Sequence, residues 1–148
     1  MSIISHEHEY LFIHIPKTGG TSIEQQFGEI VLRNRELGWW KRGMVYSGEV
    51  TGIWRTNNLK HARLLYFKNE YPAEYKRYYR WSVIRHPFDR MVSRYWHSRR
   101  FEGLTLDFET WCLNGFGGMV NQTHFLKEGG KVDCEIHRFE DGLPESAM

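Results

Sequence analysis

The residues with the most evident chemical potential form a short loop near the N-terminus. An apolar run from Tyr10 to Ile15 ends at Pro16, and the residues that follow are Lys17, Thr18, Gly19, Gly20, Thr21 and Ser22. Adjacent glycines leave backbone N–H groups accessible, and Lys17 adds a cation to them. The pattern predicts a strand, a phosphate-binding loop and a helix N-terminus, which together suit an anionic group.

The order of these residues departs from the Walker A phosphate loop. Walker A places its Lys directly after the second Gly and before Ser or Thr, whereas Lys17 precedes both glycines. The next apolar strand, expected from Tyr78 to Arg85, ends in an Arg where a Walker B sequence has a magnesium-binding Asp. We therefore expect cationic side chains and backbone amides to hold phosphate here, with no metal.

A second strand-to-helix junction follows at Arg85. A helix is expected over 87–100, where a Pro occupies the favoured first position. Apolar side chains at three- and four-residue spacing predict its buried stripe, which comprises Phe88, Met91, Val92, Tyr95 and Trp96. Arg90, Ser93 and Arg94 are expected outside that stripe. Ser93 follows Arg85 by eight residues, which is about two helical turns.

The segments Leu11 to Ser22 and Ser82 to Trp96 resemble the two signature segments of the 3'-phosphoadenosine 5'-phosphosulfate (PAPS)-dependent sulfotransferases, in the branch that includes the carbohydrate sulfotransferases. The resemblance implies that the first segment binds the 5'-phosphosulfate. It implies that Arg85 and Ser93 bind the 3'-phosphate. Lys17 would then stabilise the negative charge that grows on the departing phosphate.

A base is needed at the attacking hydroxyl, and His61 is our candidate for it. An imidazole titrates near neutral pH, and the Lys-His-Ala context of His61 is similar to a His of bacterial family members. A surface residue at the start of a helix is the other interpretation of His61. The remaining histidines also compete, and these are His6, His8, His14, His86, His97, His124 and His137.

Strand and helix patterns alternate along the chain, which favours a parallel α/β sheet. We expect a P-loop NTPase-like three-layer sandwich, in which helices flank a small central parallel β-sheet. Besides the segments above, the sequence predicts a helix over 21–28, a loop-rich region over 29–58, helices over 61–71 and 107–113, a loop over 114–118 and a strand over 132–139.

Length and composition bound the class of protein. The 148 residues suit one domain, and a net charge of +2 does not indicate a nucleic-acid partner. No apolar run approaches membrane-spanning length, and Cys112 and Cys134 lack disulfide or zinc spacing. We expect a cytoplasmic protein. We expect residues 1–148 to form one sulfotransferase-like domain. Family domains continue beyond an Arg-Phe-Glu like that at 138–140, so the chain is expected to be either a fragment or a minimal form with an unusually open adenosine site.

The resemblance implies sulfuryl transfer from PAPS to a hydroxyl or amine of an acceptor, either a glycan or a small molecule, with adenosine 3',5'-bisphosphate (PAP) as product. Two other functions stay open. A non-catalytic PAP- or PAPS-binding remnant would bind the nucleotide without transferring sulfate. A P-loop nucleotide kinase would need magnesium and ATP, and its Walker sequences are not found here.

Overall fold

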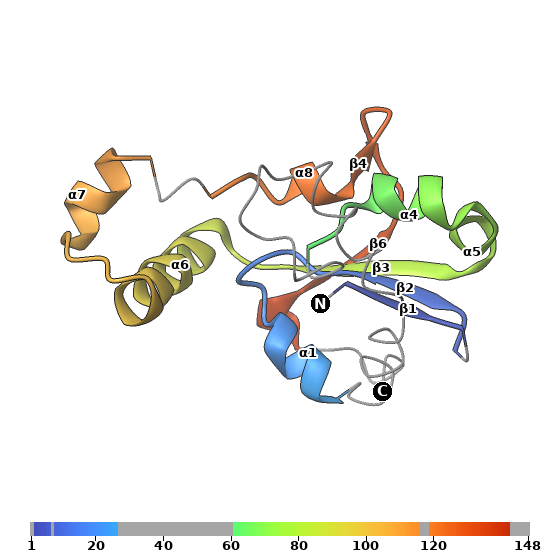
Figure 1. The fold of residues 1–148 in the computed structure, drawn as a ribbon, viewed down its shortest axis with the longest axis horizontal. Coiled ribbons are helices and arrows are strands. Elements are labelled where there is room, and N and C mark those ends of the chain that lie inside the picture. The colour runs from blue at the N-terminus through green and yellow to red at the C-terminus, as the bar shows by residue number, and fades with distance from the viewer. Residues whose placement is uncertain (1, 7, 27–60, 116–118, 143–148) are drawn as a thin grey trace.

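The computed structural model describes residues 2–6, 8–26, 61–115 and 119–142. It is a mixed α/β structure built on a four-stranded sheet (Figure 1). The strand order is β1-β2-β3-β6, formed by Ile3–Ser5, Tyr10–Ile13, Tyr79–Ile84 and Glu135–Arg138. β2, β3 and β6 run parallel, whereas β1 pairs antiparallel with β2. The predicted α/β class and the predicted strands β2 and β3 are therefore confirmed.

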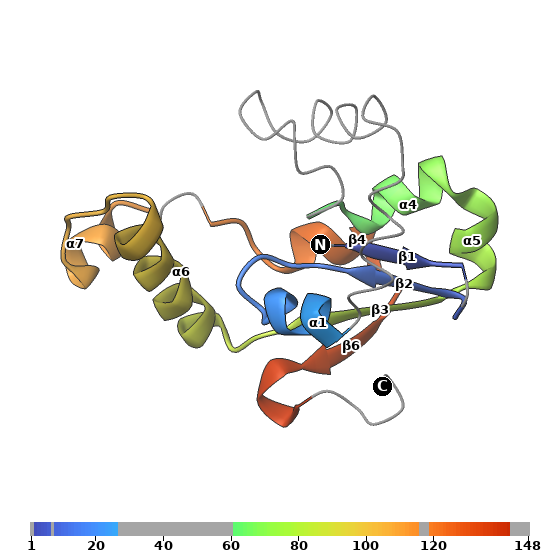
Figure 2. The ribbon, with the colours of Figure 1, turned by 60° about the horizontal axis from the view of Figure 1, so that its bottom comes forward.

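The sheet is apolar on both faces, which is why helices cover both. One face packs on α4 (Leu64–Glu70), α5 (Pro72–Arg77) and α8 (Thr123–Leu126), through a core of Ile4, Leu11, Ile13, Ile15, Ala62, Leu64, Phe67, Tyr75, Tyr78, Phe125 and Leu126. Figures 1 and 2 show α1 (Gly20–Gln26) on the other face. There the core comprises Ile3, Tyr10, Phe12, Ile23, Trp81 and Val83.

The predicted strand over 132–139 is confirmed only for Glu135–Arg138. Lys131–Val132 (β5) instead pairs with Lys127–Glu128 (β4) in a separate antiparallel hairpin. Asp133 lies between the two strands and accepts a hydrogen bond from the Tyr75 hydroxyl. It also pairs with Arg80 at 3.2 Å. These side-chain bonds hold Asp133 beside α5 and β3, at the point where the chain leaves the hairpin and enters β6.

Several helix boundaries differ from the prediction in informative ways. The helix expected over 61–71 begins at Leu64, and α5 follows it at once because Pro72 occupies the first position of a new helix. The 107–113 helix is confirmed as α7 (Phe108–Leu113), with Asp107 as its N-cap. The predicted end of the first helix at Gly28 and the loops over 29–58 and 116–118 lie outside the described residues.

The helix after β3 is confirmed as α6 (Pro87–Phe101), but its predicted buried stripe is wrong. Phe88 is 69% exposed and Trp96 62% exposed, and Val92 is exposed as well. Tyr95 is buried as predicted, yet Arg90 is buried with it. The reason is that α6 lies beyond the carboxyl ends of the strands, beside α7, and does not cover the apolar sheet (Figure 1). Within the described ranges, no helix is long and apolar enough to cross a membrane.

Candidate functional site

The two predicted junctions lie at the same edge of the sheet. β2 and β3 are parallel neighbours, and Ile13 is paired with Ser82 near the carboxyl end of each strand. The phosphate-type loop therefore emerges beside the segment that leads into α6. This edge of a parallel sheet is where ligands of open α/β folds bind.

The first junction holds a tightly wound loop. Lys17 has φ +69° and Gly19 has φ +84°, so a charged residue adopts a backbone conformation that ordinarily favours Gly. The Thr18 hydroxyl is buried and donates to the Ile15 carbonyl at 2.9 Å. The Gly19 carbonyl accepts from the backbone N–H of Ser22, which lies on the exposed first turn of α1. Backbone strain of this kind is typical of ligand-binding loops.

Two aromatic rings pack directly against the loop glycines. A Cβ at Gly20 would collide with the imidazole of His14, and a Cβ at Gly19 would lie 2.5 Å from Cε2 of Phe139. Both positions therefore require Gly for reasons of space. Thr21 is exposed beside them on α1. The loop glycines are thus close-packed against His14 and Phe139.

The second junction is fixed by side chains from distant parts of the sequence. The Arg85 N–H donates to Oε1 of Gln122 at 2.9 Å, and Nε2 of Gln122 donates to the Arg85 carbonyl at 2.9 Å. Next to it, the His86 N–H donates to Oε1 of Glu140 at 2.6 Å. This backbone bond lowers the pKa of the Glu140 carboxyl. Gln122 and Glu140 thus define the path of the chain into α6.

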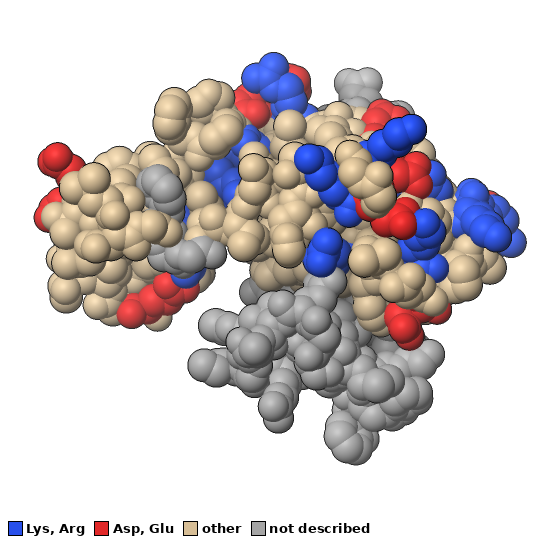
Figure 3. All heavy atoms as spheres, turned by 90° about the horizontal axis from the view of Figure 1, so that it is seen from above, with Lys and Arg blue, Asp and Glu red and all other residues tan. Residues whose placement is uncertain are grey.

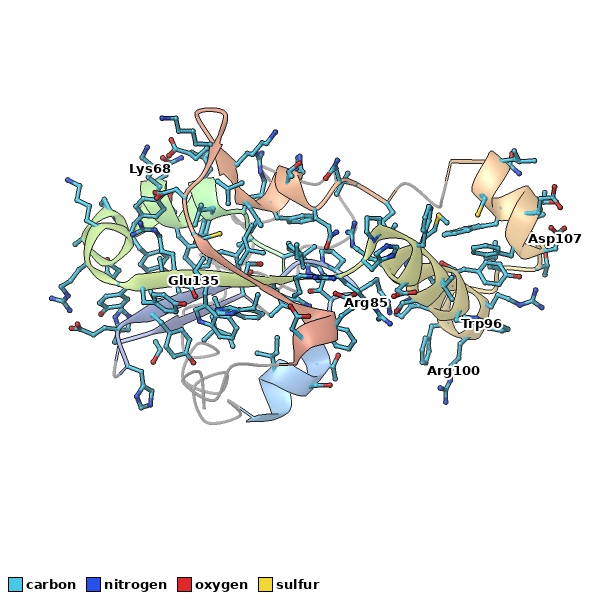
Figure 4. The ribbon with its side chains drawn as sticks, turned by 180° about the vertical axis from the view of Figure 1, so that it is seen from behind. Lys68, Arg85, Trp96, Arg100, Asp107 and Glu135 are labelled. Carbon is cyan, nitrogen blue, oxygen red and sulfur yellow. The ribbon has the colours of Figure 1, made fainter. Side chains whose placement is uncertain are left out.

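Phe139 connects the two junctions. Besides meeting Gly19, its ring lies 4.6 Å from the guanidinium carbon of Arg85. Figure 4 shows Arg85 at the end of β3, beside the short helix that follows β6. The structure thus brings Arg85 and the glycine loop against one ring. Ser93 is half-buried on α6, and among the described residues no hydrogen bond joins it to Arg85.

His61 lies beside the same loop. Its Nδ1 is 3.2 Å from the backbone carbonyl of His14, and the two imidazole rings are 4.7 Å apart. A carbonyl only accepts, so Nδ1 of His61 donates and Nε2 of the neutral ring carries the lone pair. Ser2 holds this arrangement, because its hydroxyl accepts from the His14 N–H and donates to the Ala62 carbonyl.

Lys17 also acts on α6 electrostatically. Burial lowers the pKa of His97, and the charges of Lys17 and Arg94 lower it further, against an opposing effect of Glu102. Glu102 pairs with Arg94 at 2.6 Å and lies 3.4 Å from Nδ1 of His97. The charge of Lys17 is thus close enough to α6 to lower the pKa of His97, which supports one common electrostatic environment for both junctions.

Sequence reasoning assigned no role to several of these residues. Gln122 lies outside the predicted elements, Phe139 and Glu140 belong to the Arg-Phe-Glu sequence at 138–140, and Ser2 lies just before a short strand that the sequence did not predict. For Ser2, Phe139 and Glu140, the signal that could have found them is their position beside β1 or β6, which the sheet pairs with β2 and β3, whereas Gln122 precedes α8 and offers no such signal.

The face of the molecule that carries α4, α8 and the β4–β5 hairpin shows mixed charge (Figure 3). Figure 3 shows Lys and Arg interspersed with Asp and Glu over the helices and hairpin that cover the sheet. Lys68 pairs there with Glu128 at 2.6 Å. In the described part of the chain, no group of three His, Cys, Asp or Glu could hold a metal ion. Cys112 and Cys134 are free thiols, and burial raises the pKa of Cys134 to about 11.

The structure is a mixed α/β domain with a glycine loop and an Arg at adjacent strand ends, an arrangement that suits an anionic ligand. Residues 1–124 match the model of the sulfotransferase family. The chain belongs to this family, and membership supports sulfuryl transfer as its general activity. The matched range contains both junctions and His61. No curated protein and no solved structure matches the chain.

Proposed function

We propose that this chain is a single sulfotransferase-like domain that transfers a sulfuryl group from PAPS to a hydroxyl or amine of an acceptor. The observation that carries the proposal is the contact of Phe139 with both Gly19 and Arg85, because it places the two phosphate-type junctions side by side. Helices on both faces of the sheet support a P-loop NTPase-like three-layer sandwich.

The donor would be held by two groups of residues. Lys17 and the loop residues Thr18, Gly19, Gly20, Thr21 and Ser22 would bind the 5'-phosphosulfate, and Arg85 and Ser93 would bind the 3'-phosphate. Two features of the structure fit such an anion: the strained conformation of Lys17 and the close packing of the glycines. Lys17 would stabilise the charge that develops on the departing phosphate oxygen, which is the step that most needs a cation.

The proton of the acceptor would pass to His61. The hydrogen bond from Nδ1 to His14 fixes the tautomer in which Nε2 accepts, so the ring is prepared to act as a base. His14 itself touches Gly20, so the base and the loop share a neighbour. In-line displacement then has a base on the acceptor side and Lys17 on the leaving-group side. We propose a glycan or a small molecule as the acceptor.

Calorimetry with PAP tests the donor assignment. Lys17→Ala and Arg85→Ala should each weaken binding by at least about tenfold, because each removes a charge-assisted hydrogen bond to phosphate. Lys68→Ala is the matched control, since Lys68 is exposed and pairs with Glu128 away from the site. Unchanged affinity in both site variants would contradict the proposal.

Sulfate transfer from PAPS to a panel of sugars, phenols and amines tests the activity. The wild-type chain should sulfate at least one acceptor, and His61→Ala should abolish turnover while PAP still binds. Binding of PAP without transfer to any acceptor would favour the non-catalytic binding module. Magnesium-dependent ATP binding with no response to PAP would favour the kinase.

A further inference from the structure

Arg90 is a buried cation behind the first junction. It is only 3% exposed, although it lies on a helix whose large apolar residues Phe88 and Trp96 are exposed. Its Nε donates to the Pro16 carbonyl at 2.9 Å, and its Nη1 donates to the Val120 carbonyl at 2.9 Å. Burying a guanidinium in place of an apolar side chain costs stability. The position of Arg90 therefore calls for a role beyond packing.

The charge of Arg90 has backbone carbonyls as its partners. Among the described residues, no carboxylate pairs with it, and its Nη2 is buried without a hydrogen-bond acceptor. Burial lowers the pKa of Arg90 to about 10, so the side chain is still charged at neutral pH. A full positive charge consequently lies directly behind the loop that carries Lys17, where it favours bound anions.

Of the two carbonyls that Arg90 binds, one lies at the first junction and the other in the segment that holds the second. Pro16 immediately precedes the strained Lys17, so its carbonyl lies at the start of the loop. Val120 lies two residues before Gln122, whose amide holds both backbone groups of Arg85. One guanidinium therefore joins the base of the glycine loop to the segment that positions Arg85.

We propose that Arg90 is a positioning residue that sets the separation between the two phosphate-binding junctions. This inference rests on the proposed function, because the junctions have phosphate groups to separate only if the donor is a bisphosphate. The planar fork of Arg reaches two carbonyls in different segments at once. A Lys keeps the charge but cannot reproduce that fork, so Arg90→Lys separates geometry from charge.

The first measurement is hydrogen exchange of the amides at 17–22 in the ligand-free protein. Arg90→Lys and Arg90→Gln should each exchange there about tenfold faster than wild type, because the anchor at Pro16 is lost. Arg100→Gln is the matched control, since Arg100 projects from the same helix to solvent (Figure 4). Where Arg90→Gln fails to fold, Arg90→Lys decides the result. Unchanged exchange in the folded variants overturns the proposal.

The second measurement compares PAP with adenosine 5'-phosphate. In wild type the added 3'-phosphate should strengthen binding, and in Arg90→Lys this gain should shrink by about tenfold. A purely structural defect would weaken both nucleotides equally and leave their ratio unchanged, which would overturn the proposal. If wild type binds neither nucleotide, the proposed function fails, and the exchange experiment still decides whether Arg90 anchors the loop.

Discussion

The two strand-to-helix junctions of this protein are built in different ways. The loop at 16–22 is shaped mainly by its own residues, through the Thr18 hydroxyl bond to Ile15 and the turn at Gly19. The segment that joins β3 to α6 makes its bonds to Gln122 and Glu140, which are at least 37 residues away in the sequence. The first junction thus makes most of its hydrogen bonds locally and has Arg90 and Phe139 as distant contacts, whereas the second is held by distant side chains.

This difference determines whether a substitution changes mainly the stability of the fold or mainly the geometry of the ligand site. The loop is buried around Thr18 and Gly20, so a change there disturbs close packing. His86 and Pro87 of the second junction are exposed, and their environment tolerates change more readily. We therefore expect substitutions of the buried loop residues Thr18 and Gly20 to affect mainly stability, and substitutions of the residues that hold the second junction to affect mainly nucleotide affinity.

Gly20→Ala should have the largest effect on stability. The added Cβ would meet the His14 imidazole, which is itself buried and cannot move away easily. Overpacking of this kind costs about 3 kcal/mol. Alanine is otherwise the better helix former, so without the collision the substitution at this helix start would stabilise. Urea unfolding followed by circular dichroism measures the loss.

The control is a double-mutant cycle with His14→Ala. Removing the ring should relieve the collision, so Gly20→Ala should cost much less in the His14→Ala background than in wild type. An equal cost in both backgrounds would show that the collision is not the cause. The first junction would then owe its stability to backbone conformation alone.

The same difference explains how far the sequence predicted the structure. Strands β2 and β3 and helix α6 were predictable because apolar runs end at Pro16 and Pro87, which mark the boundaries. The buried side of α6 was not predictable. The spacing of its apolar residues suits packing on the sheet, but α6 lies beyond the strand ends and does not pack there (Figure 1). Arg90 was expected outside the buried stripe, yet it is buried and donates hydrogen bonds to two backbone carbonyls. No periodicity in the sequence indicates these bonds.

The candidate site follows the same rule. Lys17 and the loop glycines were evident from residue order, and the pair of Arg85 and Ser93 from spacing and resemblance. Gln122, which holds Arg85 in place, was not evident from the sequence. Its two hydrogen bonds to Arg85 depend on a contact between segments that are far apart in the chain. Candidate ligand-binding residues can thus be proposed from the sequence, whereas the distant residues that hold them in place are found only from the structure.

Gln122→Leu should have an intermediate effect, mainly on binding. It leaves the N–H and carbonyl of Arg85 unpaired, which costs about 1 kcal/mol of stability and releases the residue proposed to hold the 3'-phosphate. PAP affinity measured by calorimetry should fall about tenfold. Asn121→Ala is the neighbouring control, since the side chain of Asn121 accepts hydrogen bonds from Thr123. A loss of stability without a loss of affinity would contradict the division between the junctions.

The smallest effect should be a dependence of stability on pH through His97, which senses Lys17 across the two junctions. Burial and the charges of Lys17 and Arg94 lower the pKa of His97 in the folded state. The unfolded chain therefore binds the proton first as the pH falls, so stability decreases from about pH 6.5 down to the folded-state pKa of His97 and no further below it. His124, whose pKa is lowered by burial and by Arg63, adds to the same slope.

His97→Gln should accordingly reduce the loss of urea resistance between pH 7.5 and pH 5.5, and Lys17→Met should raise the pKa of His97 in an NMR titration. The pKa of His124 is the internal reference, because Lys17 is not among the charges that act on it. A His97 pKa that does not respond to Lys17→Met would mean that the loop cation and α6 are electrostatically separate. The two junctions would then act as independent sites, which is the arrangement that the contacts of Phe139 and Arg90 argue against.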